Sequence, residues 1–150
     1  MSSDPRTAAW QQVREHVKAK ATAHRENGGT AVEVFADFGA VRQPPDRPVT
    51  LSFTAPDGTV ADLRSRDVDG AFLETEVRYV DTDGTRLYAL EIGDGETGLW
   101  LLVAGGIDHR SLSGYADTTG AARTVVRSAT GAVGVELRHA DRDPFFAELG

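Results

Sequence analysis

Short segments in which apolar and polar residues alternate recur along the chain from residue 32 onward, and they constrain the fold more than any other feature. Because successive side chains of a β-strand point to opposite faces of a sheet, each segment predicts a strand with one buried face. Stretches rich in glycine or proline separate the segments and predict turns and loops. Strands are expected over residues 32–38, 49–53, 73–81, 85–92, 99–103, 123–128 and 133–139.

Two features indicate how some of these strands pair. Asp83-Gly84 predicts a tight hairpin whose two central residues both have positive φ, and Thr130-Gly131 predicts a second hairpin. Leu99–Val103 is apolar at every position, which predicts a central strand that is covered on both faces.

Helical spacing replaces the alternation at the N-terminus. Asp4-Pro5 predicts a helix start, because aspartate caps a first turn and proline suits the first helical position. Apolar residues then recur at Trp10, Val13, Val17 and Ala21. Gly28 and Gly29 predict the end of this helix. Two short helices are expected as well, one after Asp57 and one over 109–118 that Asp108 caps.

The order of the predicted elements repeats along the chain. A strand, a short helix and two strands run from 49 to 92 and again from 99 to 139. This order indicates either two β-α-β-β units or a coincidence of pattern, since few residues match between the two stretches. We therefore predict one α+β domain over residues 1–150, with a mostly antiparallel twisted sheet, helices on one face and the first helix as a lid.

The charge balance favours some partners and excludes others. The 150 residues include 16 basic and 23 acidic ones, for a formal net charge of −7, and only Lys18 and Lys20 are lysines. In molar salt the Debye length falls to ~3 Å, so the self-repulsion of such a surface is largely screened. An acidic surface of this kind therefore suits the cytoplasm of a halophile. Codon usage in a high-GC bacterium would also favour arginine over lysine. The arginines are interleaved with carboxylates, so neither nucleic acid nor a membrane surface is expected as a partner.

Other sequence features bear on localisation and cofactors. The chain has no cysteine, which excludes disulfides and cysteine-ligated metal centres. Its longest apolar run, Leu99–Ala104, is far shorter than the ~20 residues that span a bilayer. The N-terminus lacks the basic and apolar parts of a signal peptide. We therefore expect a cytoplasmic protein without a cofactor.

His109 and Arg110 are the first candidate ligand-binding residues. They follow the predicted central strand, and residues between such a strand and a helix N-terminus often face a ligand, where free N–H groups favour anions. The alternative is that Asp108 caps a helix and that both residues are exposed in its first turn.

His139, Asp141 and Asp143 form the second candidate group. If the last strand continues, their side chains point to one side of it. An imidazole and two carboxylates could then ligate a divalent metal, and His139 with Asp141 could bind a ligand or act as an acid–base pair. The alternative is a histidine at the rim of the core, followed by a turn in which Asp143-Pro144 ends the strand.

The remaining polar residues carry no recognisable chemistry in the sequence. His24 is expected to be half-buried on the apolar side of the first helix and His16 to be solvated off that side. Glu74, Glu76 and Arg78 alternate and are expected on the solvated face of a strand. The sequence contains neither a phosphate-binding glycine loop nor a Gly-x-Ser-x-Gly nucleophile motif.

Three segments carry a resemblance to a known family. They are Leu-Leu-Val-Ala-Gly within Leu99–Gly106, Arg-Thr-Val-Val-Arg-Ser at 123–128, and Arg-His-Ala-Asp-Arg-Asp-Pro-Phe-Phe at 138–146. Over residues 99–146 the chain resembles a group of small uncharacterised haloarchaeal proteins. The resemblance implies a salt-adapted cytosol, and it brings neither an assigned function nor catalytic residues.

Two classes of function follow. The favoured one is a non-enzymatic binding or regulatory module for a protein or a small ligand, with a homodimer as one possible state. The alternative is a small metal-assisted or acid–base enzyme in which the fold brings His139 and Asp141 to His109.

Overall fold

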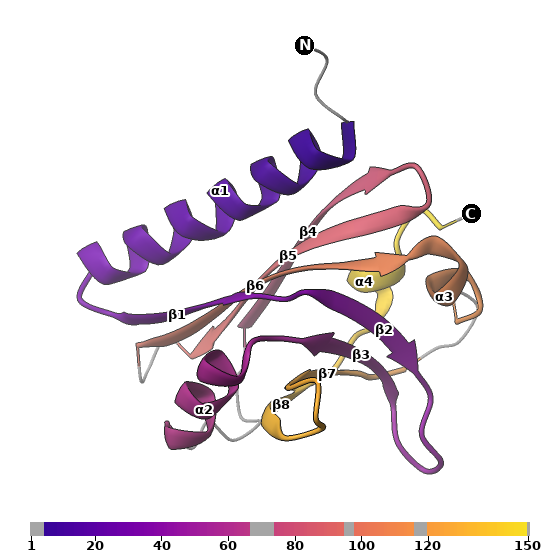
Figure 1. Ribbon diagram of the computed structural model, residues 1–150. Helices are drawn as coiled ribbons and strands as arrows, with labels where there is room; N and C mark the ends of the chain where they lie inside the picture. The colour runs from indigo at the N-terminus through magenta and orange to yellow at the C-terminus, as the bar shows by residue number, and fades with distance from the viewer. Residues whose placement is uncertain (1–4, 67–73, 95–97, 116–119, 150) are drawn as a thin grey trace.

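The computed structural model describes residues 5–66, 74–94, 98–115 and 120–149 and has an α+β fold, as the sequence predicted (Figure 1). Helix α1 lies over one four-stranded sheet, and a second four-stranded sheet lies beneath the first. Among the described residues, the helices are α1 (Pro5–Glu26), α2 (Asp57–Ser65), α3 (His109–Ser113) and α4 (Asp143–Phe146). The strands are β1 (Thr30–Phe35), β2 (Phe38–Arg42), β3 (Val49–Thr54), β4 (Glu74–Thr82), β5 (Thr85–Asp94), β6 (Leu99–Asp108), β7 (Ala122–Arg127) and β8 (Val133–His139).

The upper sheet, which lies directly under α1, has the strand order β1-β6-β5-β4. β1 is parallel to β6, whereas the β6–β5 and β5–β4 pairs are antiparallel. Alternate residues of β6 face opposite cores: Leu101 and Val103 face the lower sheet, and Leu102 and Ala104 face α1. The apolar run therefore forms a central strand covered on both faces, as predicted.

The lower sheet has the strand order β2-β3-β7-β8. β2 is antiparallel to β3, β3 is parallel to β7, and β7 is antiparallel to β8. Four of the six strand pairs between described residues are thus antiparallel, in agreement with a mostly antiparallel fold, but the strands divide into two sheets instead of one.

The division falls inside the strand that was predicted over 32–38. The N–H of Ala36 donates to the carbonyl of Ala104 in the upper sheet at 2.8 Å. The next N–H, that of Asp37, donates to the carbonyl of Thr54 in the lower sheet at 2.7 Å. Hydrophobic alternation continues through this point, so the pattern gave no signal that the chain passes from one sheet to the other.

The main core lies between the two sheets. It contains large side chains from both of them, such as Phe53 and Tyr88, which are fully buried. The short helices close this core with Leu63 of α2, Leu112 of α3 and Phe145 of α4. The two C-terminal phenylalanines therefore fix the tail to the body, as expected from the sequence.

The second core lies between α1 and the upper sheet. Val13, Val17 and Ala21 belong to the buried stripe of α1, as the helical spacing predicted. The prediction was wrong at the first position, where Ala9 is buried and Trp10 is only partly buried at the rim. Both ends of α1 are tied to the sheet side. Arg6 Nη2 donates to the carbonyl of Asp83 at 3.1 Å, and Arg25 Nη2 donates to that of Ala31 at 2.8 Å. No helix among the described residues is both long and apolar enough to cross a membrane.

The repeated order of elements is present, as β3-α2-β4-β5 and β6-α3-β7-β8. The first strand of each unit joins the sheet that contains the hairpin of the other unit. The pairings are not equivalent, because β3 is parallel to β7 whereas β6 is antiparallel to β5. The order therefore repeats without a matching repeat in sheet pairing.

Two local predictions need correction. The β4–β5 hairpin forms, but only Gly84 has positive φ, at 86°, and Asp83 does not, so the turn is not the predicted type. Helix α3 ends at Ser113, well before residue 118. Asp108 does cap α3 as predicted, with its carboxylate accepting from the N–H of Arg110 at 2.7 Å. Asp4, the predicted cap of α1, lies outside the described residues.

Candidate functional site

His139 lies at the end of β8 with its ring inside the main core and 6% of its surface exposed. Nδ1 lies 3.1 Å from the hydroxyl of Thr75, and Nε2 lies 2.7 Å from the hydroxyl of Thr124. Burial lowers the pKa of His139 to about 4 from an ordinary value of 6.5. The ring is therefore neutral near pH 7, and both of its nitrogens are engaged, which is the arrangement of a structural histidine.

Asp141 and Asp143 do not join the His139 ring. Asp141 Oδ1 accepts from the N–H of Asp143 at 2.9 Å, which shapes the turn into α4, and both residues are exposed. His139 and Asp141 do line a shared hollow of about 370 Å³ beside Phe145. Nowhere in the described parts of the chain do three or more histidine and carboxylate side chains gather in a way that could hold a metal ion.

His109 begins α3 and contacts a carboxylate of the neighbouring hairpin. Its Nε2 lies 3.0 Å from Asp81 Oδ1. Asp81 also binds Arg86 through two hydrogen bonds of 2.8 Å and 3.0 Å, and Arg86 is fully buried. Arg86 above all, and then His109, hold the pKa of Asp81 below its ordinary value. Arg110 is exposed beside this cluster.

The Arg86 cluster anchors the C-terminal tail. Arg86 Nη1 donates to the carbonyl of Phe145 at 3.4 Å, and the Tyr88 hydroxyl donates to the same carbonyl at 2.6 Å. The Phe145 ring lies between Tyr88 and His139, with centroid distances of 6.4 Å and 4.8 Å. His139 thus contacts the tail directly, whereas His109 is linked to it through Asp81 and Arg86 and does not line the hollow next to His139.

A different set of residues forms a groove between α1 and the β4–β5 hairpin, and we call it the α1–β4 groove. On α1, Gln12, His16 and Lys20 follow one another at a spacing of four and so lie on one side of the helix. On the sheet, Arg78 and Val80 of β4 and Ala89 of β5 face the same space. A hollow of about 240 Å³ is lined by Gln12, Val13, His16, Arg78, Tyr79, Val80 and Ala89.

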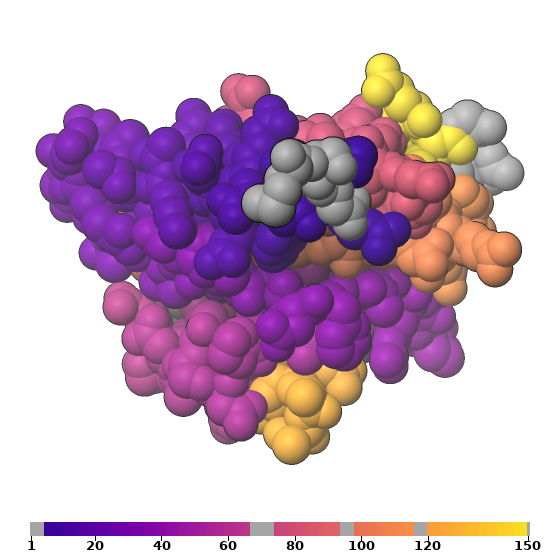
Figure 2. Space-filling view, turned by 45° about the horizontal axis from the view of Figure 1, so that its top comes forward, coloured from indigo at the N-terminus to yellow at the C-terminus, as the bar shows by residue number. Residues whose placement is uncertain are grey.

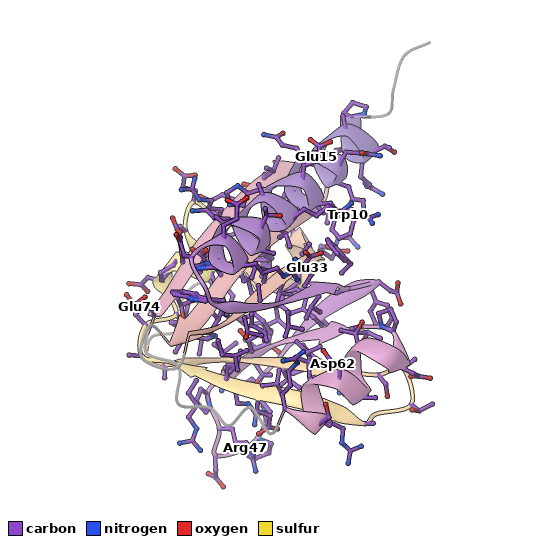
Figure 3. All side chains as sticks on the ribbon, turned by 90° about the vertical axis from the view of Figure 1, so that its left-hand side faces the viewer. Trp10, Glu15, Glu33, Arg47, Asp62 and Glu74 are labelled. Carbon is purple, nitrogen blue, oxygen red and sulfur yellow. The ribbon has the colours of Figure 1, made fainter. Side chains whose placement is uncertain are left out.

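The figures show the setting of this groove. In Figure 2, α1 covers the upper face of the molecule and the surface of the β4–β5 hairpin emerges beside it. In Figure 3, Glu74 at the start of β4 and Glu33 on β1 lie on opposite sides of the helix-covered sheet. The α1–β4 groove is on the Glu74 side, while Glu15 of α1 points away from the sheet.

The charged groups at the sheet side of the groove form a continuous chain. Arg78 Nη2 donates to Glu76 Oε1 at 3.1 Å, and Glu76 lies directly opposite Glu91 in the β4–β5 pair. Glu91 Oε2 lies 2.5 Å from His24 Nε2, and the His24 ring stacks on Trp100 at 4.1 Å. The neighbouring Glu91 carboxyl group, and then Arg78 and Lys20, lower the pKa of Glu76.

The polar side chains on the helix side of the groove lack the partners that those on the sheet side have. The side chains of Gln12, His16 and Lys20 have no hydrogen-bond or ion-pair partner among the described residues. Partial burial, and then the positive charges of Arg78 and Lys20, lower the pKa of His16 from 6.5. His16 is therefore a neutral hydrogen-bonding group near pH 7, beside two cations.

His16 was expected in solvent and is instead partly buried at this groove. Glu76 and Arg78 are exposed, as predicted for a solvated strand face, but their position beside a groove was not predicted. The available signal was the spacing of four between polar residues 12, 16 and 20 next to an apolar stripe. That spacing defines one side of a helix, but it does not say which strands lie opposite. The β4–β5 pairing sets Glu76 opposite Glu91, and the packing of α1 on this sheet brings both of them, with Arg78, next to that side of the helix.

Comparison with known proteins places the chain at family level. No curated protein and no solved structure matches it. A sequence model of one family matches residues 1–147, which confirms the resemblance to an uncharacterised family, whereas a haloarchaeal origin stays a prediction. The chain belongs to the Family of unknown function (DUF7529).

Proposed function

We propose that this protein is a non-enzymatic binding module and that the α1–β4 groove is its ligand site. The observation that carries the proposal is a hollow of about 240 Å³ lined by Gln12 and His16, with Lys20 in a smaller adjoining hollow. These three side chains have no partner among the described residues. Pockets that bind small molecules combine apolar walls with a few placed polar groups. Here Val13, Val80 and Ala89 are the apolar part.

The lining supports binding more than catalysis. The side chains around the hollow offer hydrogen-bond donors and apolar surface, and the hydroxyl of Tyr79 is directed to Glu148 at 2.6 Å. The enzyme alternative with His139, Asp141 and His109 has less support, because both nitrogens of His139 are already hydrogen-bonded and His109 does not line the hollow beside His139. Joint catalysis by these groups needs them to be close together at one site.

A titration followed by ¹H–¹⁵N NMR tests the proposal. The probes are butyrate, butylamine, butanol and inorganic phosphate, each at an ionic strength held constant with KCl. At least one probe is expected to give saturable shifts at the amides of Val13, Arg78, Val80 and Ala89. Val80→Phe fills the hollow and should abolish them. Val133→Phe is the matched control, because Val133 is 41% exposed on β8 and distant from the groove. Saturable shifts from no probe, or equal effects of the two variants, would refute the groove as the ligand site.

The proposal includes a salt-adapted cytoplasm as the place where the module works. It is supported by 23 acidic against 16 basic residues and by the presence of only two lysines. Because salt screens repulsion between like charges, the thermal midpoint should rise between low salt and molar KCl, with aggregation or loss of cooperativity at the low end. A midpoint that does not change across this range would contradict salt adaptation and leave the groove hypothesis intact.

A further inference from the structure

We infer that the ligand of the α1–β4 groove is a small carboxylate with a short apolar body, bound with its charged end between His16, Lys20 and Arg78. The inference rests on the proposed function and specifies the class of ligand.

The polar groups of the groove that remain available to a ligand are mostly hydrogen-bond donors. The two carboxyls of the groove already have partners, since Glu76 accepts from Arg78 and Glu91 contacts His24. The groups without a partner among the described residues are the Gln12 amide, the His16 ring and the Lys20 ammonium. An arginine has five N–H donors, and Glu76 takes one of those of Arg78. The remaining capacity is mostly that of donors, which calls for a ligand that accepts.

The positive charge at the groove contrasts with the acidic surface of the rest of the protein. The chain carries a net charge of −7, and both of its lysines are on α1. Lys18 lies 5.9 Å from the Phe35 ring on the β1 side of the helix, whereas Lys20 lines the groove side with Glu76 and Arg78. Arg78 lines both the 240 Å³ hollow and a smaller adjoining one of about 10 Å³, which Lys20, Glu76 and Glu91 also line. Since both carboxylates have partners, the two cations at this end of the groove attract an anion.

The hollow is small and has one apolar wall. The hollow of about 240 Å³ is smaller than the ~300–1,000 Å³ typical of pockets for drug-sized ligands. Its apolar wall of Val13, Val80 and Ala89 suits a short hydrocarbon chain next to the charged end. A guanidinium recognises a planar carboxylate through parallel hydrogen bonds, and the neutral His16 ring adds one N–H donor.

His16 also provides a readout that a purely structural groove would lack. The charged groups that face it are Lys20 on its own helix, Glu76 and Arg78 on β4, and Glu91 on β5. Lys20 and Arg78 disfavour its protonated form, and a bound anion would offset both. Binding should therefore be coupled to proton uptake by His16, so a carboxylate should bind more tightly at about pH 6 than at about pH 8.

The test compares butyrate with the three other probes while the ring signals of His16 are followed by ¹H–¹³C NMR. Butyrate should saturate, should move the titration of His16 to higher pH, and should outcompete phosphate at equal concentration. Lys20→Met should weaken butyrate binding about tenfold or more, because one charge-assisted hydrogen bond is lost. Lys18→Met is the matched control on the same helix and should leave the affinity unchanged.

The results of this test distinguish an error in the class of ligand from an error in the location of the ligand site. Binding of butylamine or butanol without butyrate would overturn the anionic class while the groove remains a ligand site. Tighter binding of phosphate than of butyrate would overturn the carboxylate with an apolar body. Equal losses in Lys20→Met and Lys18→Met would also overturn the inference, since a general charge effect would then explain them. Saturation by none of the four probes would refute the proposed function itself.

Discussion

The core between the two sheets and the core under α1 are filled with different side chains. Among the described residues, five of the nine that are buried under α1 are alanine, whereas only three of the 23 buried between the sheets are. The core between the sheets contains Phe53, Tyr88, Phe145 and Phe146. Under α1, aromatic rings such as Trp10, Phe35 and Trp100 are present only as partly buried residues at the rim.

The difference has an energetic consequence. Hydrophobic stabilisation grows with the apolar area removed from water, at about 25 cal/mol per Å². A layer of alanines therefore holds α1 less firmly than the phenylalanines and leucines hold the two sheets together. We infer that α1 is the first large element to open, and that the groove beside it belongs to the less stable part of the fold.

The largest expected effect is that of a truncation between the sheets. Phe53 is fully buried and meets Tyr88 edge to face at 6.3 Å. Phe53→Ala should lower the free energy of unfolding by about 3–5 kcal/mol, through lost burial and the cavity it leaves. Phe35→Ala, the same substitution at the rim under α1, should cost distinctly less. Urea denaturation of both variants measures the difference, and equal losses would contradict the ranking of the two cores.

The sequence was sufficient to predict most strands and helices of this fold, but not β2, α4 or the division of the strands into two sheets. The alternation around Val49–Phe53 and the apolar run at Leu99–Val103 predict strands because side-chain period follows directly from backbone geometry. The transfer of the chain between sheets at Ala36 and Asp37 depends on two adjacent N–H groups that bind carbonyls far apart in the sequence. No local pattern encodes such a choice of partners.

A second prediction concerns the protonation of His139 in the core between the sheets. The pKa of His139 in the folded protein is about 4, below its ordinary value of 6.5. Between these values the unfolded chain binds more protons, so stability rises with pH in this window. The contribution of His139 is fully present above about pH 6.5 and is lost as the pH falls towards 4.

Lowering the pH from about 7 to about 5 should therefore cost the wild type about 2 kcal/mol that His139→Gln does not lose. Urea denaturation at both pH values checks this expectation, since the other titrating groups are common to the two proteins. An identical pH dependence in the variant would show that His139 is protonated, or exposed, in the native state.

The candidate site was the harder part to predict. His139 and His109 stood out in the sequence because each ends or follows a strand next to other ionisable residues, yet both proved to be engaged by Thr75, Thr124 and Asp81. Burial and partners that are distant in the sequence decide whether a histidine is available, and neither is visible in a linear motif. His16 shows the reverse case, because a residue that looked solvated lines a hollow formed by three separate elements.

The smallest expected effect gives the most direct test of the comparison between the two cores. Val17 is 1% exposed under α1, and Val103 is fully buried between the sheets. Val17→Ala removes two methyl groups but gains helix propensity, so it should cost about 1 kcal/mol. That loss should increase hydrogen exchange at the amides of α1 while those of β5 and β6 keep their protection, because α1 opens without the sheets.

Val103→Ala should instead raise exchange throughout the chain, since the core between the sheets is shared by the most protected elements. If Val17→Ala exposed the amides of β6 as much as those of α1, then α1 and the sheets would open as one cooperative unit, and the alanine-rich layer would be as firmly held as the core beneath it.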